Sequence, residues 1–390
     1  MATYSEVLRR PGVIRVVSSQ LLARFPFGMM TLVFVLHIYA LSGSYALAGL
    51  AVGLETLGVA IASPVLGRWM GRFGVRRTIL IAASISTLTI VCIGVAPISG
   101  EAMVALCLVV GLSSPPIQSA VRTIYPLLVE KRGMGTLYAL DASLQEIIWI
   151  LGPVAATFIA AASSTTVGVL VMAFIQITGA LWFCSNREIS SLQILEPKRR
   201  LGGVLKQKIV LVNVIVGALL VGSFSGVEVG TVALFDKTTA GFVIASLSVG
   251  SILGGFVLGR RTKTRYALTK FLAVVTLGYF AVFFMPSSAI WLGTAWFIAG
   301  LCVAPALGLL GAIIGAGVKT QDAPEAYGWV GSGQTAGYAA AAAITGFVID
   351  GVSAEASLLV AGACGLAATL VAWYSAKFTP VISSQPEEES

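Results

Sequence analysis

Long apolar segments alternate with short polar segments along the whole chain. Twelve of the apolar segments are about 20 residues long, the length that an α-helix needs to cross a hydrocarbon core of about 30 Å. We predict membrane spans at 13–40, 45–66, 78–97, 103–127, 136–160, 166–184, 209–233, 240–259, 267–286, 289–316, 325–349 and 355–376. Because the segments between them are short, the pattern predicts an all-α polytopic membrane protein with no separate soluble domain.

The composition agrees with this prediction. Charged residues make up 11% of the chain, against about 25% in ordinary soluble domains, and the mean hydropathy is +0.93. Such a chain has too little polar surface to cover a soluble core in water.

The positive charges predict the orientation of the chain. Of 25 Lys and Arg residues, Arg24 and Arg122 lie inside predicted spans, and 22 lie at the chain ends or in alternate gaps. Only Lys237 lies in a gap of the other set. By the positive-inside rule, both termini are expected to face the cytoplasm. The net charge of +8 therefore reflects topology, and no nucleic-acid partner is predicted because no basic soluble face exists.

The cysteines and the single histidine show no metal-site pattern. His37 cannot form a metal site alone, and the cysteines lack C-x-x-C spacing. We interpret the five cysteines as packing thiols within or at the ends of spans, namely Cys92, Cys107, Cys184, Cys302 and Cys364. Neither a metal nor another cofactor is predicted.

The two halves of the chain repeat one another. The sequence Val65-Leu66-Gly67-Arg68 recurs 192 positions later as Val257-Leu258-Gly259-Arg260. At an offset of 189, six further residues recur, Gly111, Leu112, Pro116, Tyr138, Ser143 and Gln145 matching Gly300, Leu301, Pro305, Tyr327, Ser332 and Gln334. We therefore predict two pseudo-symmetric six-helix bundles, residues 1–184 and 209–390, joined by a basic cytoplasmic linker at 185–208.

The polar segment after the second span resembles the loop signature of the major facilitator superfamily, G-x-x-x-D-R-x-G-R-R/K. It reads Gly67-Arg68-Trp69-Met70-Gly71-Arg72-Phe73-Gly74-Val75-Arg76-Arg77. With the twelve-span, two-half layout, the resemblance implies the major facilitator fold and a gating role for the segment. Gly71 stands where the family has an Asp with a charge-relay role, and Val75 replaces an Arg. The alternative is that the glycines cap helices and the arginines serve topology alone.

A second segment, Gly152-Pro153 followed by Ala156-Thr157, resembles the antiporter motif G-P-x-x-G-G of exporters in that superfamily, with its last two glycines replaced. Proline kinks a helix, and small residues allow a neighbouring helix to approach closely. The resemblance implies export, and ordinary small-residue packing is the alternative.

Six ionisable residues lie inside predicted spans, where each costs about 2.5–3.5 kcal/mol on insertion scales and so marks a candidate functional site. They are Arg24, Glu55, Arg122, Asp141, Glu146 and Glu228. Positions within the spans place Arg24, Glu55 and Glu146 near the midplane. Arg122 and Asp141 fall near the cytoplasmic ends of their spans, where they could form an ion pair. Asp141 and Glu146 point about 140° apart around one helix, so one should face the central cavity and the other a neighbour in its own half.

The repeat distinguishes the two acids of the fifth span from their neighbours. Asp141 and Glu146 correspond to Val330 and Thr335, whereas Gln145 is matched by Gln334. Acids present in only one half indicate added function, and we predict proton coupling by one of them, with Arg24, Glu55 and Arg122 as partners. Burial favours the neutral form of a carboxyl, and competition between a proton and a cation for one carboxylate suffices for antiport. Static pairing or snorkelling is the alternative for Arg122, Asp141 and Glu228.

The second half has few charges and many aromatic residues, which suits a hydrophobic or amphipathic substrate. The sequence therefore predicts a proton-coupled exporter of a small molecule, working by alternating access as a monomer in a bacterial inner membrane. Its expected partners are the substrate, protons and the lipid bilayer. The alternatives are a metabolite importer, a lipid flippase of the same fold, or a non-transporting sensor or scaffold. The sequence contains no cluster of metal ligands and no nucleophile positioned with a base, so an enzyme is not predicted.

Overall fold

The computed structural model describes residues 3–190, 194, 200–259 and 264–379. Within this part of the chain every regular element is helical. Arg260 of the predicted repeat, part of the predicted linker and the C-terminal residues 380–390 lie outside the described residues.

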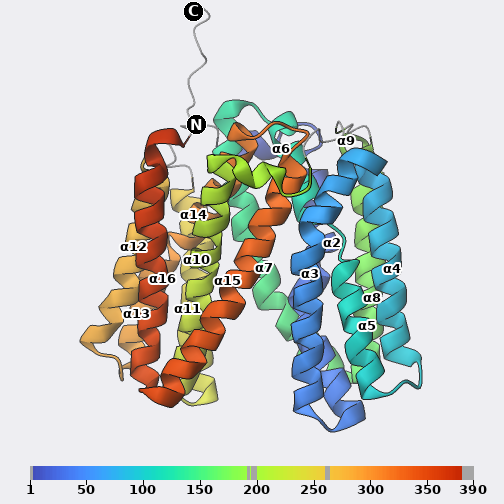
Figure 1. Ribbon diagram of the computed structural model, residues 1–390, viewed down its shortest axis with the longest axis horizontal. Helices are drawn as coiled ribbons and strands as arrows, with labels where there is room; N and C mark the ends of the chain where they lie inside the picture. Colours follow the sequence, from blue (N-terminus) through green and yellow to red (C-terminus); the bar gives the residue numbers. More distant parts are fainter. Residues whose placement is uncertain (1–2, 191–193, 195–199, 260–263, 380–390) are drawn as a thin grey trace, which may run out of the picture.

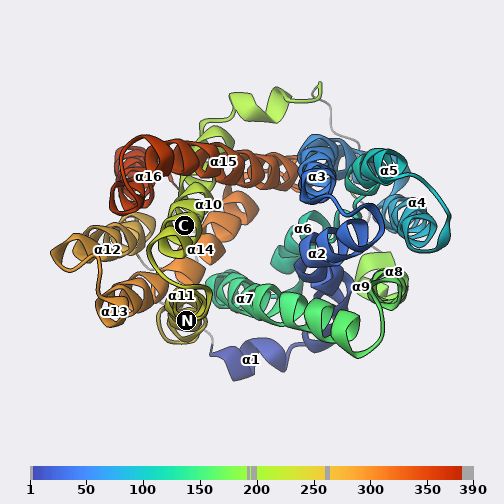
Figure 2. The same cartoon turned by 90° about the horizontal axis from the view of Figure 1, so that it is seen from below.

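The first group of helices contains α1 (Tyr4–Leu8), α2 (Val13–Ser42), α3 (Tyr45–Phe73), α4 (Val75–Val95), α5 (Gly100–Leu112), α6 (Ile117–Leu128), α7 (Lys131–Ala162), α8 (Thr165–Ser185) and α9 (Arg187–Ser190). The second group contains η1 (Gly203–Lys206), α10 (Lys208–Leu234), α11 (Lys237–Leu258), α12 (Ala267–Ala281), η2 (Val282–Phe284), α13 (Ala289–Gly300), α14 (Val303–Gly317), α15 (Ala323–Gly351), α16 (Ala354–Ser375) and η3 (Ala376–Phe378). Figures 1 and 2 show the groups side by side. We call the end of the bundle that carries α9 the linker end, and the other end the opposite end.

Eleven helical segments in the described part of the chain are long and apolar enough to cross a membrane. They match eleven of the twelve predicted spans. The remaining prediction, 325–349, falls on α15, which has 29 residues but is less apolar than the others. Its middle turns contain Gly, Ser, Gln, Thr and Tyr residues. The helix packs on α10, α3 and α16.

Two predicted spans, 103–127 and 289–316, are broken helices. The first is interrupted between α5 and α6 at Ser113–Pro116, where two consecutive prolines lack the backbone N–H that a helix requires. The second is interrupted at Leu301 and Cys302, between α13 and α14. The repeated Gly-Leu pair with its later proline marks both breaks, so the interruption is itself part of the repeat.

The segment predicted as a gating loop is mostly helix. α3 continues to Phe73, and Gly74 alone makes the turn, with a φ of 88°. Positive φ favours glycine because it has no Cβ. Val75, in place of the Arg of the family signature, is 1% exposed and packs in the core at the start of α4.

The two groups meet in the half of the bundle nearer the linker end. α3 packs on α15, and α7 packs on α14 and α11. One apolar cluster combines residues of both groups, including Tyr138 and Tyr327, whereas the cluster around Phe34 belongs to the first group alone. Toward the opposite end α7 and α15 become exposed, as at Trp149 and Phe347. The groups are therefore closest at the linker end, as Figure 1 shows.

Candidate functional site

Asp141 of α7 lies at the centre of a buried polar cluster in the first group. Its Oδ1 accepts hydrogen bonds from Arg24 Nη1 of α2 at 2.9 Å and the Tyr125 hydroxyl of α6 at 3.1 Å, and its Oδ2 accepts from Arg122 Nε at 3.1 Å. Gln20 Nε2 donates to Oδ1 at 3.3 Å. The side chains of Asp141, Arg24 and Arg122 are 0%, 3% and 6% exposed. One carboxylate meets two guanidinium groups, so these three residues carry a net charge of +1 away from solvent.

Glutamines satisfy the other donors of Arg24. Its Nη1 donates to Gln20 Oε1 at 2.8 Å, and its Nη2 donates to Gln118 Oε1 at 3.3 Å and to Gln145. Gln145 lies one turn beyond Asp141 on α7, so the two side chains share a face of the helix. Both Nη atoms of Arg24 and the Nε of Arg122 therefore donate charge-assisted hydrogen bonds within this cluster.

The predicted pair between Arg122 and Asp141 is confirmed, but the predicted difference in depth between Arg24 and Asp141 is wrong. α7 begins at Lys131 and not at 136, so Asp141 lies about 15 Å along the helix at 1.5 Å per residue. Arg24 lies about 16 Å along α2 by the same measure. The two residues therefore reach the same level of the bundle and bond directly.

Tyr138 connects this cluster to the second group of helices. Its hydroxyl donates to the backbone carbonyl of Arg122 at 2.7 Å and lies 2.6 Å from the hydroxyl of Tyr327 in α15. Its ring packs edge-on against Tyr125, with centroids 5.3 Å apart. The contact between the two groups is thus adjacent to the charge cluster.

Glu146 faces the other side of α7. It is half-buried and lies beside the hydroxyl of Ser251 in α11. Among the described residues, no basic side chain lies within ion-pair distance of it. The two acids of α7 therefore differ as predicted from their angular separation: Asp141 faces its own half, and Glu146 faces the other half.

Glu55 lies on a packing seam between α3 and α5. It is 8% exposed, and its Oε2 accepts a hydrogen bond from the Thr56 hydroxyl at 3.3 Å. A Cβ added at Gly111 would meet its backbone carbonyl, and a Cβ at Gly300 would meet the carbonyl of Leu247 in the same way. Leu247 is the repeat counterpart of Glu55, so this position is a site of helix packing in both halves. The seam lies outside the Asp141 cluster, which α2, α6 and α7 form.

Glu228 of α10 forms a separate polar contact in the second group. Its Oε2 accepts a hydrogen bond of 2.5 Å from the Tyr338 hydroxyl of α15. Gln334, also on α15, packs against α10 near Gly217, where an added Cβ would lie 3.3 Å from its Cγ. Gln334 thus faces α10 as Gln145 faces α2, but no arginine occupies the equivalent place.

Arg68 of the signature segment bridges the two groups at the linker end. Its Nη1 lies 3.2 Å from Glu325 Oε2 at the start of α15, and Glu325 is 3% exposed. The other oxygen of Glu325 accepts hydrogen bonds from the Gly202 backbone N–H at 2.8 Å and the Trp329 indole at 3.4 Å. This contact joins α3, the segment before η1 and α15. Glu325 was not predicted, because it is the first residue of the predicted span 325–349 and was not counted among the charges inside spans; its neutral repeat counterpart, Thr136, was a usable signal.

Gly67 and Gly152, one from each motif, both lie where two helices approach closely. A Cβ at Gly67 would meet the backbone of Pro324, so α3 and α15 approach closely there, and a Cβ at Gly152 would meet the backbone of Gly28 in α2. Gly71 is half-buried. Arg72 lies over the ring of Phe73, at 5.4 Å from its centroid, and Arg76 and Arg77 are exposed at the start of α4.

Gln145 was predicted as a candidate site residue, but three other neutral members of the cluster, Gln20, Gln118 and Tyr125, were not. Gln20 precedes Arg24 by one helical turn, and Gln118 and Tyr125 flank Arg122 at helical spacing on one face of α6. These spacings were a usable signal, because a buried arginine requires several acceptors around it.

The geometry defines a helical membrane protein in which two groups of helices meet beside a buried charge cluster. Residues 16–235 match the family model described as Major Facilitator Superfamily. This match covers more than half of the chain, which therefore belongs to the major facilitator superfamily. The protein is an integral membrane transporter and not an enzyme.

Solved structures with the same fold come from transporters of different cargo. The human organic anion transporter MFSD10 has a TM-score of 0.77 at 13% identity, covering 93% of this chain and 100% of that chain. A bacterial homologue of the iron transporter ferroportin, in an outward-facing state, has a TM-score of 0.75 at 13% identity, covering 94% of this chain and 99% of that chain. The E. coli fucose:proton symporter FucP has a TM-score of 0.75 at 13% identity, covering 93% of this chain and 98% of that chain. At these identities the likeness shows the fold alone. No curated protein has a matching sequence.

Proposed function

We propose that this transporter couples the export of a hydrophobic or amphipathic small molecule to proton entry, by alternating access. In this proposal the halves 1–184 and 209–390 rock about their contact, and the segment 185–208 joins them. The linker end faces the cytoplasm of a bacterial cell, as the distribution of positive charge supports, and the monomer is the working unit. The contact between Arg68 and Glu325 separates when the linker end opens.

Glu146 is the residue that carries this proposal. Its carboxyl lies where the halves face one another, half-buried, with no basic group among the described residues to fix its charge. Asp141, in contrast, is held by Arg24 and Arg122. A carboxyl without a fixed cation can bind a proton in one step of the cycle and release it to a competing substrate in another. Asp141 keeps the helices around it in register.

The difference between the halves supports an amphipathic substrate. The first half presents the polar cluster and Glu146, whereas the repeat counterpart of Asp141 is the buried valine Val330. A molecule held between the halves therefore meets a polar side and an apolar side. The likeness of Gly152-Pro153 to an antiporter motif supports export as the direction.

An organic anion is the second candidate class of substrate. The observation that favours it is the net charge of +1 on Arg24, Arg122 and Asp141. MFSD10, which shares the fold, is named as an organic anion transporter. An anion needs Arg24 to exchange one glutamine acceptor for the substrate, whereas a cation needs Glu146.

The test is a proton-flux assay in energised inverted membrane vesicles that contain the wild type or Glu146→Gln. Lipophilic cations, neutral amphiphiles and organic anions are added singly, and the decrease of the pH gradient is recorded. We expect a response to cationic or neutral amphiphiles that Glu146→Gln abolishes. A response to organic anions alone supports the second candidate.

Glu101→Gln is the matched control, because Glu101 is exposed in the first turn of α5 and the charge change is the same. It should respond like the wild type. Absence of any response in the wild type would overturn proton-coupled export of these classes. A response that survives Glu146→Gln would exclude Glu146 as the proton carrier.

A further inference from the structure

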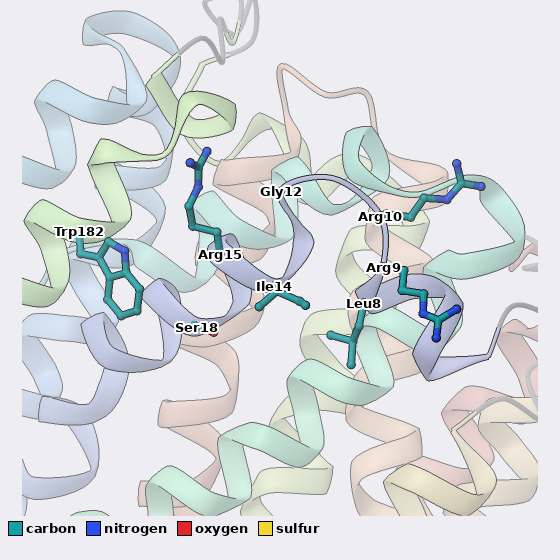
Figure 3. A pocket seen from close by; sticks show the side chains of 8 residues that line it. All are labelled: Leu8, Arg9, Arg10, Gly12, Ile14, Arg15, Ser18 and Trp182. Carbon is teal, nitrogen blue, oxygen red and sulfur yellow. The ribbon is translucent and has the colours of Figure 1, made fainter.

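A groove on the surface of the first group lies at the linker end, between α1, the beginning of α2 and the end of α8. It is a shallow, open groove with a volume of about 560 Å³. Figure 3 shows Arg9 and Arg10 at one side of the groove, Arg15 at the other, and apolar side chains between them. Nothing in the proposed transport cycle uses these residues.

The apolar side chains of the groove face outward. Ile14 is 57% exposed and Trp182 is 42% exposed. Ile14 lies in the first turn of α2 and Trp182 in the last turn of α8, and both helices are candidate membrane spans. Tryptophan at the end of a span sits at the level of the lipid headgroups. These two exposed positions therefore lie at the level where the hydrocarbon core is expected to begin.

The charged side chains of the groove leave positive charge uncompensated. Arg15 pairs with Glu188, with Nη2 and Oε2 3.1 Å apart, and Arg10 pairs with Glu130. Arg9 is exposed and forms no ion pair with any residue that the structure describes. The carboxylate of Glu188 accepts a hydrogen bond from the backbone N–H of the same residue and lies beside Arg15. The hydrogen bond first, and Arg15 second, keep the pKa of Glu188 below its usual range. Three arginines thus face two carboxylates, and Arg9 has a free guanidinium.

We propose that this groove binds the phosphodiester headgroup of an anionic membrane lipid. Arg15 contacts the phosphate, Arg9 on the other side of the groove attracts the headgroup by its charge (Figure 3), and Ile14 and Trp182 contact the upper part of an acyl chain. A guanidinium group forms charge-assisted hydrogen bonds to phosphate oxygens, and basic residues beside a span attract anionic headgroups. A soluble phosphate would use the arginines but leave the apolar side chains without a partner, so the lipid is the occupant that matches the whole groove.

Native mass spectrometry of the full chain in detergent tests this assignment. The probes are phosphatidylglycerol and phosphatidylcholine with identical acyl chains. We expect the wild type to bind phosphatidylglycerol more tightly than phosphatidylcholine. Arg9→Gln should weaken phosphatidylglycerol binding about fivefold, and Arg9→Gln with Arg15→Gln about 25-fold, as expected for about 1 kcal/mol per basic side chain. Phosphatidylcholine binding should not change.

Arg265→Gln is the matched control, because Arg265 is exposed on the second group before α12. It should bind both lipids like the wild type. Arg9→Gln breaks no ion pair of the described chain, so it remains informative even where Arg15→Gln disturbs the fold. Equal binding of the two lipids by the wild type, or unchanged binding by the Arg9 variant, would overturn the proposal. Displacement of phosphatidylglycerol by millimolar glycerol 3-phosphate would also overturn it, since the groove would then be a site for small anions.

Discussion

The hydroxyl groups of Tyr138 and Tyr327 lie 2.6 Å apart at the contact between the two halves. Each also reaches a backbone carbonyl 16 positions earlier, that of Arg122 at 2.7 Å and that of Gly311 at 3.0 Å. Both pairs of residues are related by the internal repeat, so a pseudo-twofold axis passes between the hydroxyls. Two hydroxyl protons serve three contacts, and therefore one contact lacks a proton at any moment.

The paired tyrosines should stabilise closure of the linker end. Tyr138→Phe or Tyr327→Phe removes one hydroxyl and leaves a buried carbonyl without its donor, a loss of about 1–3 kcal/mol. Because the hydroxyls interact, we expect the double variant to lose less than the sum of the single losses. Thermal unfolding of the four proteins in detergent measures this. Strictly additive losses would show that the hydroxyls are not coupled.

Asp141→Asn should be strongly destabilising. It leaves Arg24 and Arg122 buried beside one another without their carboxylate, and breaking a buried ion pair costs about 3–5 kcal/mol. Asp141→Asn combined with Arg122→Gln restores the net charge of +1 and should recover part of the loss. The measurement is the unfolding temperature from intrinsic tryptophan fluorescence. An unchanged unfolding temperature for Asp141→Asn would contradict the central position of this carboxylate.

Arg68→Gln should shift the protein toward a conformation open at the linker end. The variant leaves Glu325 with the Gly202 N–H and the Trp329 indole but no cation. Electron paramagnetic resonance distances between spin labels at Ser185 and Lys319, both exposed at the linker end, should include a longer population. Arg265→Gln, with the same charge change at that end, should not produce it. Identical distance distributions for Arg68→Gln and the wild type would argue against a gating contact.

Gly152→Ala should separate α7 from α2. An added Cβ meets the backbone of Gly28, which cannot yield without moving a helix. Gly346→Ala is the matched control, because Gly346 is also helical and has open space at the Cβ position. Alanine there should be neutral or stabilising by up to about 1 kcal/mol, since it favours helix more than glycine. Equal unfolding temperatures for Gly152→Ala and the wild type would contradict the close approach.

The architecture could be predicted from the sequence because hydrophobic length, positive charge and internal repeat all act along the chain. The interruptions at Ser113–Pro116 and Leu301–Cys302 were not predicted, since apolar composition alone does not register a missing N–H or a tight turn. The polar α15 was predicted as a span from its length, and its packing against three other helices explains its composition.

The site was partly predictable. Charges inside spans are rare enough to stand out, and the angular separation on α7 correctly assigned Asp141 and Glu146 to different sides. Arg24 was predicted as a partner of these acids, but its direct bond to Asp141 was not, because a shift of five residues in the start of α7 changes the depth of Asp141 by about 7 Å. The contact of Arg68 with Glu325 joins positions 257 apart, and no local spacing encodes it.

Proton release on substrate binding is the most direct consequence of a proton carrier at Glu146. A cationic amphiphile that decreases the pH gradient in the vesicle assay is added to the purified transporter in weakly buffered detergent solution with a pH indicator. We expect the wild type to release a proton as it binds the amphiphile, whereas Glu146→Gln should release none and Glu101→Gln should behave like the wild type. Saturable binding by the wild type without any proton release would contradict proton coupling through Glu146.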